Sequence, residues 1–157
     1  MKLKIGDAAP EIHLPDQDGT VHSLADYRGK WVLLYFYPKD DTPGCTAEAC
    51  AIRDNFPEFG KLDAVVLGIS VDSEKSHKKF AEKHELPFTL LADDKKEVVQ
   101  KYGVWGTKKF MGREYDGTSR TSFLIGPDGT VAKIYEKVKP EIHAEEVLKD
   151  ITVFKSA

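Results

Sequence analysis

Two short apolar runs are the clearest structural signal along the chain. Residues 30–38, KWVLLYFYP, and residues 64–71, AVVLGISV, are apolar at both odd and even positions. Because successive strand residues point to opposite faces of a sheet, such runs are typical of central strands that are covered on both sides. A third strand is expected over residues 87–93, PFTLLAD.

Helical patterns alternate with these strands. We expect helices over residues 46–55, 72–85, 95–103 and about 141–154. Pro57 disturbs the first helix near its end, because proline cannot continue a helical hydrogen-bond ladder. Asp72 or Ser73 is the expected capping residue of the second helix, and Gly103 closes the third. Strand, helix and strand in alternation predict parallel pairing joined by right-handed crossovers.

Two hairpins complete the predicted architecture. Residues 120–138, RTSFLIGPDGTVAKIYEKV, are expected to turn at Pro127–Gly129, and residues 11–24 to form a smaller hairpin turning at Asp18–Gly19. The fold class is therefore α/β, a mixed sheet with helices on both faces, in one domain over residues 1–157. No element is predicted between the third helix and Arg120. There Trp105 and Phe110, like Trp31 earlier, are interpreted as packing residues or pocket walls.

Composition and charge restrict the function classes. The net charge of −3 gives no global reason to bind nucleic acid or an acidic membrane surface. The apolar run WVLLYFY has seven residues, far fewer than the roughly 20 that span a bilayer. Early Asp and Pro residues interrupt the N-terminal stretch, which therefore has no signal-peptide core. We expect a cytoplasmic protein, and in that compartment a permanent disulfide is disfavoured.

The chain has only two cysteines, and both lie where the first strand leads into a helix. Cys45 and Cys50 belong to YPKDDTPGCTAEAC, residues 37–50. In such sheets reactive groups gather beyond the carboxyl ends of the strands. Cys45 is expected in or just before the first helical turn, where unpaired N–H groups and the helix dipole favour a thiolate. Cys50 lies deeper in the helix, so the two thiols should be chemically unequal.

The spacing of the cysteines limits how they can combine. On an intact helix, five residues separate the Cα atoms by roughly 8–9 Å, whereas a disulfide needs about 7 Å or less. Local unwinding would be required, which suits a transient disulfide better than a static one. A structural disulfide, two inert thiols and a zinc site remain open, although the five histidines lack ligand spacing. A four-cysteine iron–sulfur cluster is excluded, because two cysteines are missing.

The loop before Cys45 carries a family resemblance. PKDDTPGC places Pro38, Thr42 and Cys45 in a Pro-x-x-x-Thr-x-x-Cys pattern that resembles the active-site loop of peroxiredoxins. Flanking stretches such as KIGDAAPEIHLPDQDG, VLGISVDS, YGVWG and RTSFLIGPDG resemble the bacterioferritin comigratory (peroxiredoxin Q) subfamily, whose second cysteine lies five residues after the first. The resemblance covers most of the chain.

The resemblance implies a role for each matching residue. Cys45 would be the peroxidatic thiolate, which becomes a sulfenic acid, and Cys50 the resolving thiol of an intramolecular disulfide. Thr42 would present its hydroxyl to the thiolate and the peroxide, and Pro38 would shield the pocket from water. Arg120 would stabilise the thiolate and the developing charge.

The resemblance also implies the setting of the reaction. The fold would be thioredoxin-like with an N-terminal hairpin extension. The substrates would be hydrogen peroxide and organic hydroperoxides, and thioredoxin or a similar dithiol protein would be the reductant. No metal or other cofactor is needed, because sulfur carries the redox chemistry. The subfamily and the intrachain cysteine pair favour a monomer.

Other interpretations of these residues stay open. Thr42 could be only a helix cap, Pro38 a strand terminator and Arg120 a surface residue of a strand. Arg53 could face the pocket or lie on a solvated or ion-paired helix face. Glu48 is interpreted as a helix-start acid or a hydrogen-bond partner rather than a general base. Two other function classes also stay open: a thiol–disulfide oxidoreductase, which would normally show Cys-x-x-Cys, and a non-enzymatic chaperone.

Overall fold

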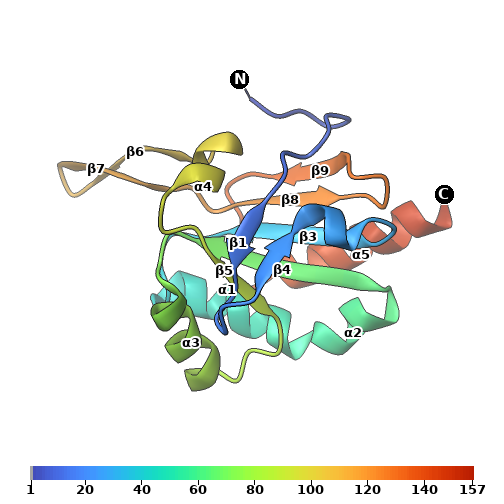
Figure 1. Cartoon of the computed structure of the whole chain (residues 1–157), viewed down its shortest axis with the longest axis horizontal. Coiled ribbons are helices and arrows are strands. Elements are labelled where there is room, and N and C mark those ends of the chain that lie inside the picture. The colour runs from blue at the N-terminus through green and yellow to red at the C-terminus, as the bar shows by residue number, and fades with distance from the viewer. Residues whose placement is uncertain (1) are drawn as a thin grey trace.

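The computed structural model describes residues 2–157 and is built on a central five-stranded sheet (Figure 1). Its strands, in spatial order, are β5 (Thr89–Ala92), β4 (Ala64–Ser70), β3 (Trp31–Phe36), β8 (Thr121–Ile125) and β9 (Val131–Tyr135). The pairs β3–β4 and β4–β5 are parallel, and the pairs β3–β8 and β8–β9 are antiparallel. The predicted mixed sheet, with its first half parallel, is confirmed.

The helices follow the predicted order with small shifts at their ends. They are α1 (Pro43–Asp54), α2 (Phe56–Lys61), α3 (Glu74–Lys83), α4 (Glu97–Lys101) and α5 (His143–Ser156). Ser73 caps α3, because its hydroxyl accepts a hydrogen bond from the Ser76 backbone N–H at 3.1 Å. Pro57 occupies the first turn of a separate helix, α2, where a missing N–H has no consequence.

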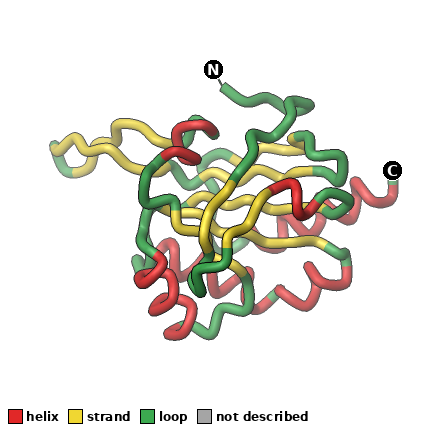
Figure 2. Tube along the Cα trace, in the orientation of Figure 1, coloured by secondary structure: helices red, strands yellow, loops and turns green. Residues whose placement is uncertain are grey.

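The sheet separates two apolar cores. Alternate residues of β3 divide between them: Leu33 and Tyr35 pack with α1, α2, α3 and α5, whereas Leu34 and Phe36 pack with α4 and the N-terminal hairpin. This hairpin consists of β1 (His13–Pro15) and β2 (Val21–Ser23), followed by the 3-10 helix η1 (Leu24–Tyr27). Figures 1 and 2 show the hairpin crossing one face of the sheet, with α1, α2 and α5 behind the other.

Besides the short helices α2 and η1, one hairpin was not predicted. Strands β6 (Trp105–Phe110) and β7 (Arg113–Thr118) form a hairpin that projects from the body of the protein (Figure 1). Its turn residues Met111 and Gly112 have positive φ, 52° and 81°, as a tight two-residue hairpin turn requires. The interpretation of Phe110 as a packing residue is wrong, since 65% of its surface is exposed. Trp31 and Trp105 do pack against the two cores.

Candidate active site

Cys45 lies at the start of α1, beyond the carboxyl end of β3. It is the third residue of the helix and only 2% of its surface is exposed. Thr42, the residue before the helix, has an extended backbone, and its carbonyl accepts the first helical hydrogen bond from the Thr46 N–H at 2.8 Å. The backbone N–H groups of this first turn have no acceptor within the helix, so they favour negative charge beside them. The predicted position of Cys45 is confirmed.

Arg120 reaches Cys45 from a distant part of the sequence. Phe36 at the end of β3 pairs with Thr121 at the start of β8, which places Arg120 beside the loop that leaves β3. The Arg120 Nη2 donates a hydrogen bond to the Cys45 Sγ at 3.4 Å, and Nη1 donates to the Glu48 Oε1 at 2.8 Å. Burial opposes the charge of Arg120, but Cys45 and Glu48 outweigh it and raise the pKa of the guanidinium.

Gly44 explains how the guanidinium fits over the helix. A Cβ atom at this position would lie 2.8 Å from Nη2 of Arg120, closer than nonbonded atoms approach. The absence of a side chain therefore lets Arg120 lie across the first turn of α1 and reach the sulfur. A side chain at this position would displace the end of the Arg120 side chain.

Glu48 lies three residues after Cys45 on the same face of α1 and is completely buried. Burial raises its pKa to about 7, against the opposing attraction of Arg120. Among residues 2–157, neither the Glu48 Oε2 nor the nearby Tyr35 hydroxyl has a hydrogen-bond partner. Burial, followed by Glu48 and Cys45, raises the pKa of Tyr35 well above its ordinary value, so this hydroxyl stays protonated. The expected role of Glu48 as a hydrogen-bond partner is confirmed.

Thr42 and Pro38 lie in the loop between β3 and α1. The Thr42 hydroxyl donates to the Lys39 carbonyl at 2.8 Å and does not cap the helix. Within residues 2–157 it forms no hydrogen bond to Cys45. Pro38 is half-buried and begins the loop after Tyr37. The roles of Thr42 and Pro38 toward a peroxide remain predictions.

Cys50 is a free, half-buried thiol further along the same helix. Arg53 belongs to this end of α1: its Nη1 donates to the His84 carbonyl at 2.7 Å and its Nε to Asp54 at 3.0 Å. The hydrogen bond to Asp54 and, more weakly, the nearby Cys50 raise the pKa of Arg53. Of the two interpretations of Arg53, the ion-paired helix face is the one observed.

Lys108 is a second cation near the site, and no sequence pattern predicted it. It extends from β6, and its Nζ donates a hydrogen bond to the Thr118 carbonyl. Burial and the charge of Arg120 lower the pKa of Lys108, whereas Cys45 raises it, so all three lie within electrostatic range. No sequence signal marked Lys108, because the hairpin that carries it was not predicted.

The sequence matches the model of the AhpC/TSA family over residues 5–134. Peroxiredoxin Bcp of Bacillus subtilis is 47% identical over 151 residues, which cover 96% of each chain. Peroxiredoxin Bcp of Escherichia coli K12 is 50% identical over 146 residues, 93% of this chain and 94% of that protein. The chain belongs to the peroxiredoxin family. It is thus a thiol peroxidase, an enzyme that reduces peroxides at the expense of a thiol reductant.

Solved structures of other peroxiredoxins agree with this assignment. A cysteine-to-serine mutant of PrxQ from Xylella fastidiosa superposes with a TM-score of 0.93 and 34% identity over 99% of both chains. The bacterioferritin comigratory protein of Xanthomonas campestris superposes with a TM-score of 0.88 and 36% identity over 97% of both chains. The predicted thioredoxin-like fold is confirmed for this peroxiredoxin. Between residues 2 and 157, no helix is long and apolar enough to cross a membrane.

Proposed function

We propose that Cys45 is the peroxidatic residue of this peroxiredoxin. Its thiolate attacks one peroxide oxygen, the O–O bond breaks, and the other oxygen leaves as water or an alcohol after taking up a proton. The sulfur is oxidised to a sulfenic acid. The single observation that supports this assignment best is the hydrogen bond from Arg120 to a buried sulfur at a helix start. Arg120 stabilises both the thiolate and the charge that develops on the leaving oxygen.

Cys50 is the resolving residue in this proposal. Its thiol attacks the sulfenic sulfur, an S–S bond forms, and the hydroxyl group leaves as water. Both cysteines lie on the continuous helix α1, where five residues correspond to roughly 8–9 Å between Cα atoms. A disulfide needs about 7 Å or less, so α1 opens locally before resolution. Opening also carries the oxidised sulfur out of its pocket to a reductant.

The other parts of the reaction are assigned by the same reasoning. Thr42 orients the peroxide through its hydroxyl, and Pro38 limits access of water to the pocket. The Xanthomonas campestris relative is described in connection with alkyl peroxide reduction, which supports organic hydroperoxides as substrates beside hydrogen peroxide. Thioredoxin or a similar dithiol protein reduces the disulfide. The chain acts as a monomeric single domain in the cytoplasm.

A coupled assay tests this function. Peroxide-dependent NADPH oxidation is measured with thioredoxin and thioredoxin reductase, with hydrogen peroxide and cumene hydroperoxide as substrates and the Cys45→Ser variant as the control. We expect turnover by the wild type with both peroxides and none by the variant. Reduction of an insulin disulfide without any consumption of peroxide would instead favour a thiol–disulfide oxidoreductase. Equal rates for wild type and variant would refute the role of Cys45.

A further inference from the structure

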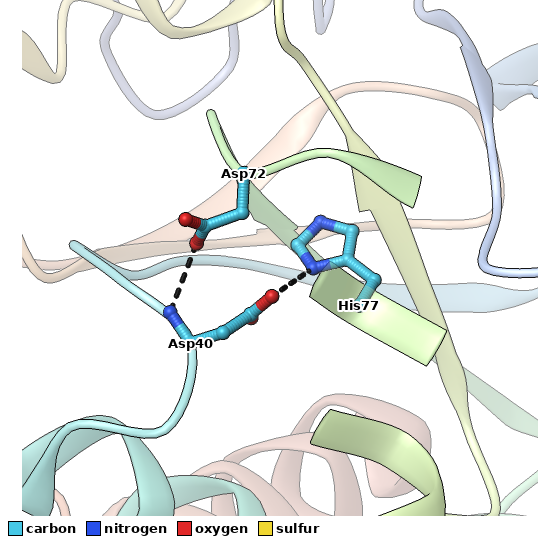
Figure 3. A group of neighbouring side chains, drawn as sticks. All are labelled: Asp40, Asp72 and His77. Atoms are coloured by element: carbon cyan, nitrogen blue, oxygen red, sulfur yellow. Dashed lines mark hydrogen bonds and ion pairs between the residues drawn. The ribbon is translucent and has the colours of Figure 1, made fainter. Parts of the chain in front are cut away.

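A second buried polar cluster holds the loop that precedes Cys45. This loop runs from Tyr37 to Thr42 and rests against α3. Figure 3 shows its Asp40 facing His77 of α3 and Asp72, the second residue after β4. The side chains of Asp40 and His77 are 4% and 0% exposed, and their Oδ2 and Nδ1 atoms lie 2.7 Å apart. Ser76, next to His77 on α3, donates to the same Asp40 oxygen at 2.7 Å.

One potential metal-ligating atom from each of Asp40, Asp72 and His77 lies within 4.8 Å of the other two. These atoms, however, are already engaged in hydrogen bonds within the protein. The Asp72 Oδ2 accepts from the Asp40 backbone N–H at 2.9 Å and from the Ser70 hydroxyl at 2.7 Å. The His77 Nε2 faces the Leu91 carbonyl at 2.9 Å. The cluster is therefore a hydrogen-bond network rather than a metal site. Its function depends on where its protons lie.

The contacts of His77 define how many protons the pair holds. A carbonyl oxygen can only accept, so the Nε2 that faces Leu91 carries a hydrogen. The 2.7 Å contact between Nδ1 and Asp40 requires another hydrogen between them. A neutral imidazole has one N–H and an ionised carboxylate has none. The pair consequently needs one proton more than a neutral histidine beside an ionised aspartate.

No neighbouring group removes this requirement. The Tyr37 hydroxyl lies 3.4 Å from the His77 Nδ1 but 2.6 Å from the other Asp40 oxygen, so its single proton is donated to Asp40. Burial raises the pKa of Tyr37 well above its ordinary value. The Ser76 proton is likewise directed at Asp40. Asp72 offers its Oδ2 to the Asp40 backbone, not to the histidine ring. With two hydroxyl donors already on the Asp40 carboxyl group, the proton stays between Asp40 and His77.

We propose that Asp40 and His77 share one proton, and that this pair positions the catalytic loop on α3. The proposal rests on the assignment of Cys45 above, since Asp40 lies five residues before it and two before Thr42. Without that proton, the Nδ1 lone pair would face a carboxylate oxygen at 2.7 Å, and this contact would no longer hold the loop on α3. Tyr37 and Asp72 are the other titratable groups facing the pair, and neither supplies a replacement proton.

The adjacent Asp41 provides a matched comparison. It has a positive φ of 56° and pairs with Lys83 at 2.7 Å and His84 at 3.1 Å, also on or next to α3. The Asp41 and Lys83 side chains are exposed, and exposed ion pairs contribute little to stability. We therefore assign the positioning role to the buried Asp40–His77 pair, while Asp41 adds only a surface contact.

Nuclear magnetic resonance tests the proton directly and without reference to activity. Long-range ¹⁵N–¹H spectra of the reduced wild type at pH 7.5, assigned with a His77→Asn variant, report both ring nitrogens of His77. The Asp40 ¹³Cγ shift reports the carboxyl group. We expect either a ring protonated at both nitrogens or a protonated Asp40, each of which places the shared proton. An unprotonated Nδ1 together with an ionised Asp40 would overturn the proposal even if the protein is an active peroxidase.

Stopped-flow measurement of the first oxidation of Cys45 tests the positioning role. Asp40→Ala should slow this step by about tenfold or more, because small displacements of a reacting group are costly. Asp40→Asn should rescue most of the rate, since its amide can donate to Nδ1 of a neutral His77 and accept from Tyr37. Lys83→Ala, which removes the exposed ion pair between α3 and Asp41 without changing the loop itself, should react like the wild type. An Asp40→Ala protein with native circular dichroism and the wild-type rate would refute positioning while leaving the role of Cys45 intact.

Discussion

The two ends of helix α1 place the two cysteines in different surroundings. Cys45 is buried in the first turn, with an arginine hydrogen-bonded to its sulfur. Cys50 is half-buried in the C-terminal half of the helix, where Arg53 directs its hydrogen bonds to Asp54 and the His84 carbonyl. The first environment stabilises an anion and excludes water, whereas the second leaves a thiol accessible. Reactivity and accessibility are thus divided between two ends of one helix.

This division fits the proposed mechanism, in which Cys45 is the peroxidatic residue, Cys50 is the resolving residue and α1 opens between the two steps. The peroxidatic sulfur needs a preorganised pocket with donors already in place. The resolving thiol needs only to meet the oxidised sulfur after the helix opens. Because α1 has 12 residues and is followed at once by the separate helix α2, its opening need not disturb the central sheet.

Exchanging each cysteine for serine should give the largest contrast between the two ends. Cys45→Ser should abolish reaction with peroxide, because the nucleophile is gone. Cys50→Ser should be oxidised once at the wild-type rate and then accumulate sulfenic acid. Single-turnover stopped-flow kinetics, with trapping of the sulfenic acid by dimedone, measures both steps. A Cys50→Ser protein that cannot be oxidised even once would contradict the division of roles.

The opening of α1 should change hydrogen exchange strongly but locally. In the disulfide form, amides from about residue 45 to residue 53 should lose on the order of 100-fold protection, because the intact helix cannot accommodate the bond. Strands β3 and β4 should keep their protection and serve as the internal control. Exchange followed by mass spectrometry on the reduced and oxidised protein gives the comparison. Equal protection of α1 in both forms would show that resolution occurs without unfolding.

Filling the space above the first turn should affect the Cys45 end alone. Gly44→Ala places a Cβ atom 2.8 Å from the Arg120 guanidinium, which must move away from the sulfur. We expect the rate of Cys45 oxidation to fall by about tenfold, since one donor to the developing charge is lost or displaced. Gly60→Ala in α2 is the matched control, because no atom lies within 4 Å of its added Cβ. Equal rates for both variants would mean that Arg120 adapts without loss.

Much of this site could be predicted from the chain because its components are local. The apolar runs predicted β3 and β4, and the loop motif placed Cys45 at a helix start. The contact between Arg120 and Cys45 depends on strand register, specifically the pairing of Phe36 with Thr121, which no local pattern reveals. For Arg120 the family resemblance supplied what periodicity could not.

The features that escaped prediction depend on tertiary structure. The β6–β7 hairpin reads as a polar stretch without strand alternation, and its tip carries exposed Phe110 and Met111. The unusual state of Glu48 arises only after burial beside Arg120, and the network of Asp40 and His77 joins residues 37 positions apart. Such contacts are created by packing, so a single sequence contains no direct signal for them.

The smallest expected effect concerns Glu48 and has a defined pH range. Its pKa of about 7 in the folded protein exceeds the ordinary value of 4.5. Between these values the folded protein holds a proton that the unfolded chain has lost. The free energy of unfolding should therefore decrease as pH rises through this window, by up to roughly 1.4 kcal/mol per pH unit. Glu48→Gln, whose side chain cannot ionise, should remove this contribution.

Urea unfolding at half-unit steps from pH 4.5 to 8 measures the difference between the Glu48→Gln variant and the wild type. Glu58→Gln is the control, because Glu58 is exposed on α2 and pairs with Lys61 at the surface. We expect its pH profile to parallel that of the wild type. Glu48→Gln should also slow Cys45 oxidation severalfold, since a neutral amide holds the Arg120 fork less firmly than a carboxylate. Parallel stability profiles for all three proteins would show that Glu48 ionises normally and that burial is offset by Arg120.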